Sequence, residues 1–117
     1  MIRVYCYEKC STCKKALKWL TGRGVEFETA DIRSMHPDKE TLRALWKRSG
    51  LPLRRFFNTS GVRYREEGLS AKLSSMDDEA QLSLLASDGM LVKRPLLVCE
   101  SAVIPGFRET DWERALS

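Results

Sequence analysis

Cys10-Ser11-Thr12-Cys13 follows a short apolar run, Ile2 to Tyr7, and opens a segment with a different periodicity. The run is β-branched and aromatic, so it predicts a strand. After it, apolar residues recur at helical spacing: Cys13, Ala16, Leu17 and Leu20. Cys10 therefore stands where a strand ends and a helix begins. There the free backbone N–H groups and the positive end of the helix dipole stabilise a thiolate.

The next elements indicate an α/β protein. Residues 21–24 contain two glycines and stop the helix, and residues 25–31 alternate as a second strand. Strand, helix and strand within about 35 residues predict a βαβ unit with parallel strands. Residues 33–90 then indicate a helical insertion without convincing strands. Its helices are expected from Pro37 to Gly50, over 69–73, and from a capping box at 75–78 to Gly89.

The β pattern returns late in the chain. Residues 96–99 and 102–104 predict two strands joined by a two-residue hairpin at Glu100-Ser101. A last helix is expected after a second capping box, Thr110-Asp111-Trp112-Glu113. The elements together predict a small mixed sheet with helices packed on it.

Composition indicates a soluble, cytoplasmic protein of one domain. The chain has 117 residues, of which 43% are hydrophobic and 31% are charged. No apolar run approaches the roughly 18 residues that span a bilayer, and no signal-peptide pattern opens the chain, so we expect no membrane partner. The net charge of +4 could serve an anionic substrate or an acidic partner, or be a solvated surface. Without interleaved aromatic residues, no direct binding of nucleic acid is expected.

The cysteines indicate thiol chemistry. Four cysteines are too few and too clustered for a secreted disulfide scaffold, and one C-x-x-C near a βαβ unit is typical of a thioredoxin-like redox motif. Cys10 is expected to be the exposed attacking thiol, and Cys13, on the apolar face, the shielded resolving thiol. Nearby lysines should lower the pKa of Cys10 into the range of about 3.5–7.5. These are Lys9, Lys14 and Lys15.

Two other interpretations of the cysteines exist. A zinc site usually needs a second close pair of ligands. Cys6 and Cys99 could complete four sulfurs, but Cys6 lies within a predicted strand, so no metal is expected. Alternatively, the cysteines are small buried residues. This suits Cys6 and Cys99, but suits Cys10 poorly because its neighbours are polar.

Lys93-Arg94-Pro95 is the second group of interest. A proline is tolerated at the start of a strand, and a cis bond before Pro95 would turn the preceding backbone toward the cysteine loop. Arg94 and Arg108 could both point to one end of the sheet and bind an oxyanion beside the helix N-terminus. For each arginine the alternative is a surface ion pair, such as that of Arg108 with Glu109 or Asp111. The spacing leaves both alternatives open.

Several motifs resemble one known family. Cys10-Ser11-Thr12-Cys13-Lys14-Lys15-Ala16, Leu91-Val92-Lys93-Arg94-Pro95-Leu96 and Gly106-Phe107-Arg108 resemble the arsenate reductase (ArsC) family. The branch concerned is glutaredoxin-coupled and includes the Spx and MgsR regulators, and the similarity extends over essentially the whole chain. It implies a thioredoxin-like (glutaredoxin-like) fold with a mixed four-stranded sheet, flanking helices and an inserted helical subdomain. The core would comprise residues 1–32 and 91–117, and the insertion residues 33–90.

The resemblance also implies roles for single residues. In the family's arsenate reductases a cysteine at the position of Cys10 attacks arsenate, and three arginines hold the oxyanion. Arg94 and Arg108 match two of these, but Asn58 stands at the third and no histidine shortly precedes Cys10. Cys13 replaces a non-cysteine, which favours a redox-active Cys10–Cys13 disulfide. Substrate would be bound by four residues: Ser11, Thr12, Arg94 and Arg108.

The favoured function is a thiol-dependent reductase that has no bound cofactor. Its substrate would be a small oxyanion, a thiol or a disulfide, and its electron donor glutathione with glutaredoxin, or thioredoxin. One alternative is an Spx-like regulator that binds the RNA polymerase α subunit and is switched by oxidation of its C-x-x-C. Another is a structural domain whose cysteines stay reduced under mild oxidant.

Overall fold

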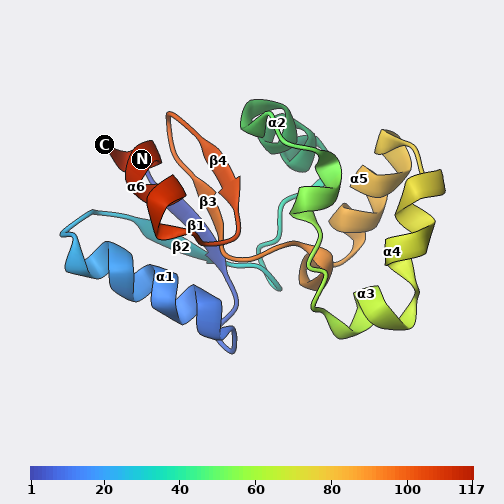
Figure 1. The fold of residues 1–117 in the computed structure, drawn as a ribbon, viewed down its shortest axis with the longest axis horizontal. Helices are drawn as coiled ribbons and strands as arrows, with labels where there is room; N and C mark the ends of the chain where they lie inside the picture. The colour runs from blue at the N-terminus through green and yellow to red at the C-terminus, as the bar shows by residue number, and fades with distance from the viewer.

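The computed structural model describes all 117 residues, with four strands in one mixed sheet of order β2-β1-β3-β4 (Figure 1). β1 (Arg3–Cys6) lies parallel to β2 (Glu28–Asp31) and antiparallel to β3 (Leu96–Val98). β3 pairs with the antiparallel edge strand β4 (Val103–Pro105). α1 (Ser11–Gly22) connects β1 to β2, so the predicted βαβ unit is confirmed. The fold is thioredoxin-like, as the resemblance implied.

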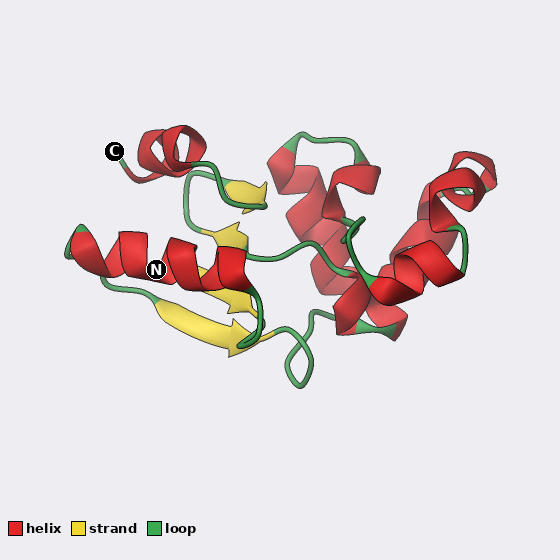
Figure 2. Cartoon of the chain, turned by 60° about the horizontal axis from the view of Figure 1, so that its bottom comes forward, coloured by secondary structure: helices red, strands yellow, loops and turns green.

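Two helices cover one face of the sheet. α1 and the last helix, α6 (Glu109–Leu116), both lie against this face (Figure 2). Their contact with the sheet is a cluster of seven buried residues: Val4, Cys6, Cys13, Ala16, Leu20, Leu97 and Trp112. Alternate residues of a strand point to one face, so Val4 and Cys6 of β1 both point toward α1. This packing anchors the first turn of α1, where the C-x-x-C lies.

The segment between β2 and β3 is helical, as expected. It contains four α-helices and three 3-10 helices: α2 (Lys39–Ser49), η1 (Leu53–Phe56), α3 (Val62–Glu66), α4 (Leu69–Lys72), η2 (Leu73–Ser75), α5 (Asp78–Ser87) and η3 (Gly89–Leu91). The sequence analysis did not predict α3. The insertion and the other face of the sheet share a cluster of 17 buried residues, which includes Tyr5 and Leu96. None of the helices is both long and apolar enough to cross a membrane.

Some predicted boundaries were wrong. β2 begins at Glu28 and not at residue 25, because the Val25 N–H still bonds to the carbonyl of Leu20 in the helix connection. Neither predicted capping box exists. Asp77 is the N-cap of α5 and accepts a hydrogen bond from the Ala80 N–H at 2.8 Å, while Arg108 is the N-cap of α6 without a side-chain bond.

Other predicted features agree with the structure. Gly50 ends α2 in the left-handed conformation, with a φ of 68°. The start of α2 differs from the prediction: the helix begins at Lys39 with Asp38 as its N-cap, and Pro37 lies outside it. In the β3–β4 hairpin, the Cys99 N–H donates to the Ala102 carbonyl at 3.0 Å. The chain therefore reverses over the two predicted hairpin residues.

Candidate active site

Cys10 occupies the predicted strand–helix joint. It is the N-cap of α1, with extended backbone angles, and its Sγ accepts a hydrogen bond from the Cys13 N–H at 3.4 Å. The Cys10 N–H donates to the Tyr7 carbonyl at 3.0 Å, which closes the turn after β1. The Cys10 side chain is half-buried, whereas Ser11 and Thr12 are exposed. The Cys10 sulfur therefore lies at the N-terminus of α1 and within reach of solvent.

Cys13 lies one helical turn further and is only 1% exposed. It packs in one buried cluster with Cys6, which is 8% exposed at the end of β1. All four cysteines are free thiols in this structure. The expected asymmetry between an accessible Cys10 and a shielded Cys13 is therefore present.

The pKa of Cys10 differs from the expectation. Partial burial raises the pKa of this thiol above its usual value, and the N–H groups of Cys13 and Thr12 offset only part of this effect. The expectation of a lowered pKa is wrong for this resting state. The three neighbouring lysines are exposed and none hydrogen-bonds to the sulfur: Lys9, Lys14 and Lys15.

The pKa values of the two buried thiols move in opposite directions. The hydrogen bond to Cys6, and then burial, raise the pKa of Cys13 far above its usual value. The same interaction lowers the pKa of Cys6. Cys13 therefore keeps its proton in the resting protein.

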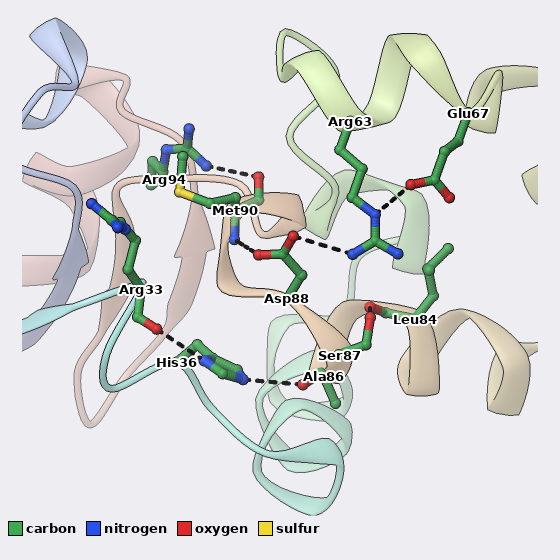
Figure 3. Close-up of polar contacts among 10 residues, drawn as sticks. All are labelled: Arg33, His36, Arg63, Glu67, Leu84, Ala86, Ser87, Asp88, Met90 and Arg94. Carbon is green, nitrogen blue, oxygen red and sulfur yellow. Dashed lines mark hydrogen bonds and ion pairs between the residues drawn. The ribbon is translucent and has the colours of Figure 1, made fainter.

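Several contacts fix Arg94, among them the hydrogen bond to the Met90 carbonyl that Figure 3 shows. Its Nη1 donates to the carbonyls of Met90 and Val92, at 2.9 and 3.3 Å. Its guanidinium carbon lies 5.3 Å from the centroid of the Tyr7 ring, close enough for a cation–π contact. The peptide bond between Arg94 and Pro95 is cis, as the sequence analysis considered. Arg94 has no hydrogen bond to Cys10.

Asn58 supports Arg94, a role that the sequence analysis missed. With its amide oxygen facing Arg94, Asn58 accepts hydrogen bonds from Nη1 and Nη2, both at 3.1 Å. Asn58 is 9% exposed, and its own N–H donates to the Leu91 carbonyl at 2.7 Å. Asn58 therefore orients the guanidinium of Arg94. Only a pattern of paired change among relatives would have revealed this from sequence.

Arg108 makes no hydrogen bond to Cys10. It is exposed and forms no ion pair with Glu109 or Asp111, so the surface-pair alternative is wrong for this arginine. Its side chain lines a cavity of about 360 Å³, which Arg55 and Lys93 also line and Cys10 does not. The backbone before it is tied to the cis-proline, because the Gly106 N–H donates to the Pro95 carbonyl at 2.8 Å.

Arg33 is a further cation that the sequence analysis did not single out. Its guanidinium carbon lies 5.8 Å from the Tyr7 ring centroid, so Tyr7 contacts both Arg33 and Arg94. Figure 3 shows the two arginine side chains near one another, with His36 below Arg33. His36 is structural, since its Nε2 lies 3.0 Å from the Ala86 carbonyl, which it contacts across the insertion. Two positive charges therefore lie beside the turn that carries Cys10.

Comparison with known proteins places this geometry in context. The ArsC family model matches residues 5–115. The uncharacterized protein YusI of Bacillus subtilis is 51% identical over 109 residues, which cover 93% of this chain and 92% of YusI. The crystal structure of an ArsC-family-related protein from Bacteroides fragilis has a TM-score of 0.94 at 46% identity, over 97% of this chain and 96% of that chain. The global transcriptional regulator Spx of Enterococcus faecalis is 24% identical over 116 residues, covering 99% of this chain and 86% of Spx.

Proposed function

Because the chain belongs to the ArsC family, we propose that it is a thiol-dependent reductase with Cys10 as nucleophile. Cys13 would resolve the intermediate through a Cys10–Cys13 disulfide. One observation carries this proposal: the half-buried Cys10 sulfur caps α1, and the N–H of the buried Cys13 lies 3.4 Å from it. Two sulfurs one helical turn apart can close a small disulfide ring with little backbone movement.

The proposed reaction is a two-step exchange. The Cys10 thiolate bonds to one sulfur of a substrate disulfide, and the other substrate sulfur leaves as a thiolate and takes up a proton. Cys13 then loses its proton, bonds to the Cys10 sulfur and expels the second substrate thiolate. The substrate gains two electrons and the cysteine pair becomes a disulfide. Thioredoxin, or glutathione with glutaredoxin, would return the protein to the dithiol state.

The charges near Cys10 favour an anionic substrate. We assign Arg94 and Arg108 to its recognition, and the backbone N–H groups of Ser11 and Thr12 to the stabilisation of negative charge at the helix N-terminus. Asn58 already uses two donors of Arg94, and Arg108 makes no hydrogen bond to Cys10. This arrangement favours an acidic thiol–disulfide substrate, such as a glutathione mixed disulfide, over arsenate.

Turnover tests this function directly. The rate of reduction would be measured with a glutathionylated peptide and with arsenate, each with a thioredoxin system or with glutathione and glutaredoxin. We expect turnover with the glutathionylated peptide, loss of it to background in Cys10→Ser, and no loss in Cys99→Ser, because Cys99 is a buried cysteine outside the site. Wild-type rates in Cys10→Ser would contradict the proposal.

The similarity to Spx supports a second candidate, a redox-switched regulator that binds the α subunit of RNA polymerase. The observation that favours it is the match to Spx over 99% of this chain. A pull-down with the isolated C-terminal domain of RNA polymerase α would compare oxidised protein with Cys10→Ser. Binding that depends on the oxidised state would support the regulator, and no binding in either state would remove it.

A further inference from the structure

Three of the four cysteines belong to one cluster between β1 and α1. Cys6 and Cys13 are both within the buried cluster under α1, and Cys10 packs against its edge. Cys99 lies elsewhere, in the β3–β4 hairpin, where its sulfur contacts Ser101 and the Ala102 carbonyl. Cys6 and Cys99 are buried to a similar extent, 8% and 6% exposed, so burial alone does not distinguish them. What distinguishes them is their neighbours: Cys6 packs in one cluster with Cys13, and Cys99 does not.

The sulfurs of this cluster follow one another from the surface to the core. The Cys10 sulfur is half-buried at the N-cap and is bonded to the Cys13 N–H. The Cys13 thiol is buried in the same cluster as the Cys6 thiol. Cys6 in turn donates to the Val4 carbonyl at 3.7 Å. Because Cys6 lies two residues after Val4 in β1, both side chains point to the face of the sheet that α1 covers. Cys13 is therefore the middle member, in contact with both of the others.

We propose that Cys6 is a second resolving thiol that moves the disulfide from Cys10–Cys13 to Cys6–Cys13. This inference rests on the proposed function, because it starts from the Cys10–Cys13 disulfide. In the step, Cys6 loses its proton and its sulfur bonds to the Cys13 sulfur. The Cys10–Cys13 bond breaks, and Cys10 leaves as a thiolate that takes up the proton. The exchange is internal, so no net oxidation or reduction occurs.

The geometry determines which sulfur is attacked. Cys6 and Cys13 share the buried cluster, whereas Cys10 only packs against its edge, so the attack falls on the Cys13 sulfur and Cys10 is the leaving group. Thiol–disulfide exchange is faster when the leaving thiolate is stabilised. The departing Cys10 sulfur lies at the helix N-terminus, where the N–H groups of Thr12 and Cys13 offset part of the cost of placing a negative charge on a partly buried sulfur.

The exchange changes what the oxidised protein can do. The disulfide is stored between two residues that are 8% and 1% exposed, where a protein reductant cannot reach it directly. Cys10 is meanwhile a free thiol again and can bond to a second substrate before the protein has been reduced. Reduction requires the exchange to run backward and to restore the Cys10–Cys13 bond. The oxidised protein would thus be an equilibrium between two disulfides.

Disulfide mapping tests the inference on the full chain. Protein oxidised with one equivalent of oxidised glutathione is treated with iodoacetamide, and its peptides are identified by mass spectrometry. We expect a Cys6–Cys13 disulfide with alkylated Cys10 in the wild type and in Cys99→Ala, and only a Cys10–Cys13 disulfide in Cys6→Ala. Alkylation of Cys10 in the oxidised protein should be at least about tenfold faster in the wild type than in Cys6→Ala, because exchange liberates its thiolate.

The outcomes separate this inference from the proposed function. A wild type that contains only the Cys10–Cys13 disulfide, with Cys10 as slow to alkylate as in Cys6→Ala, overturns the inference and leaves the proposed function standing. Absence of any disulfide at Cys13 in every variant overturns both. The wild-type map needs no substitution, so the test holds even where Cys6→Ala perturbs folding. Cys6→Ser, which keeps a similar side-chain volume, is the second variant and should behave as Cys6→Ala does.

Discussion

At the scale of single residues, the state of Cys10 depends on two opposing effects. Its sulfur caps α1 and accepts a hydrogen bond from the Cys13 N–H, which favours the thiolate. Partial burial disfavours the thiolate and is the larger effect, so the pKa is raised. A thiol of higher pKa is a stronger nucleophile once it is deprotonated. In the resting protein Cys10 is therefore mostly protonated, and the small fraction of molecules with a Cys10 thiolate is strongly nucleophilic.

The pH dependence of Cys10 alkylation tests this account. The rate of reaction with iodoacetamide should keep rising past pH about 8.5, the usual thiol value, because the thiolate fraction is still increasing there. The reaction would be followed by mass spectrometry in Cys13→Ser, so that only the accessible thiol of the pair reports. A rate that levels off near pH 7 would show a lowered pKa instead.

Asn58 makes a second prediction at this scale. Asn58→Leu removes the oxygen that accepts from Nη1 and Nη2 of Arg94. Hydrogen bonds to charged groups contribute about 1.5–3 kcal/mol, so the free energy of unfolding should fall by a similar amount in denaturant titrations. Asn58→Asp keeps an acceptor in place and is the matched control. Equal stability of Asn58→Leu and wild type would exclude the supporting role.

The sequence was sufficient to place Cys10 but not to determine its pKa. The change from strand to helical periodicity is local, and it located the N-cap residue correctly. Burial of Cys10 and the contact between Cys6 and Cys13 depend on packing between β1 and α1, which no local pattern contains. The role of Asn58 depends likewise on a residue 36 positions away, Arg94.

At the scale of elements, the ion pairs between α2 and α5 hold two helices of the insertion together. Arg43 of α2 bonds to the carboxylate of Glu79 through both Nη atoms, and Lys39 Nζ lies 3.4 Å from the same carboxylate. These cations lower the pKa of Glu79 from 4.5 to about 2. A carboxyl group whose pKa is lower in the folded than in the unfolded protein stabilises the fold at pH values above its unfolded pKa. This stabilisation is lost as the pH falls through its folded pKa.

Thermal unfolding at several pH values checks this pair. Between pH 4.5 and 2 the melting temperature of the wild type should fall more steeply than that of Glu79→Gln, because only the wild type loses the paired carboxylate in that window. Glu8→Gln is the control, since Glu8 is exposed and forms no ion pair. Parallel curves for wild type and Glu79→Gln would contradict the assignment.

Close backbone packing at η3 gives a further prediction. A Cβ on Gly89 would lie 1.8 Å from the Ile32 carbonyl oxygen, a backbone atom that cannot turn away. Gly89→Ala should therefore lower the free energy of unfolding by roughly 1–3 kcal/mol or more. Gly22→Ala is the control: nothing lies within 4 Å of its added Cβ, and a change of about 0.4–1 kcal/mol in the stabilising direction is expected. Chemical denaturation would measure both, and a neutral Gly89→Ala would contradict the contact.

Helix ends were harder to predict than helix faces. Leu42 and Leu45, the buried residues of α2, lie three positions apart in the sequence, which is helical spacing. The expected box at residues 75–78 was wrong because Asp77 itself caps α5, two residues later than Ser75. Several polar residues near a helix start are equivalent caps in sequence, and the packing of the helix selects among them.

At the scale of the whole molecule, the sheet separates two environments. One face packs against α1 and α6 and contains the three neighbouring cysteines, while the other face shares its buried residues with the insertion. The segment that joins η3 to β3 carries Arg94, which lies against the ring of Tyr7, three residues before Cys10. The periodicity of the sequence predicted the sheet and the helical insertion. It did not predict that Arg108 would line a cavity with Arg55 and Lys93, because the direction of an exposed side chain has no local signal.

The most direct test of the central claim is to trap the intermediate with Cys13→Ser. If Cys10 attacks and Cys13 resolves, this variant incubated with a glutathionylated peptide should accumulate a mixed disulfide on Cys10, detectable by intact mass spectrometry. Wild-type protein should pass through that state and accumulate an internal disulfide, and Cys10→Ser should form neither. Failure of Cys13→Ser to accumulate an adduct on Cys10, while wild type still reduces the peptide, would contradict the claim.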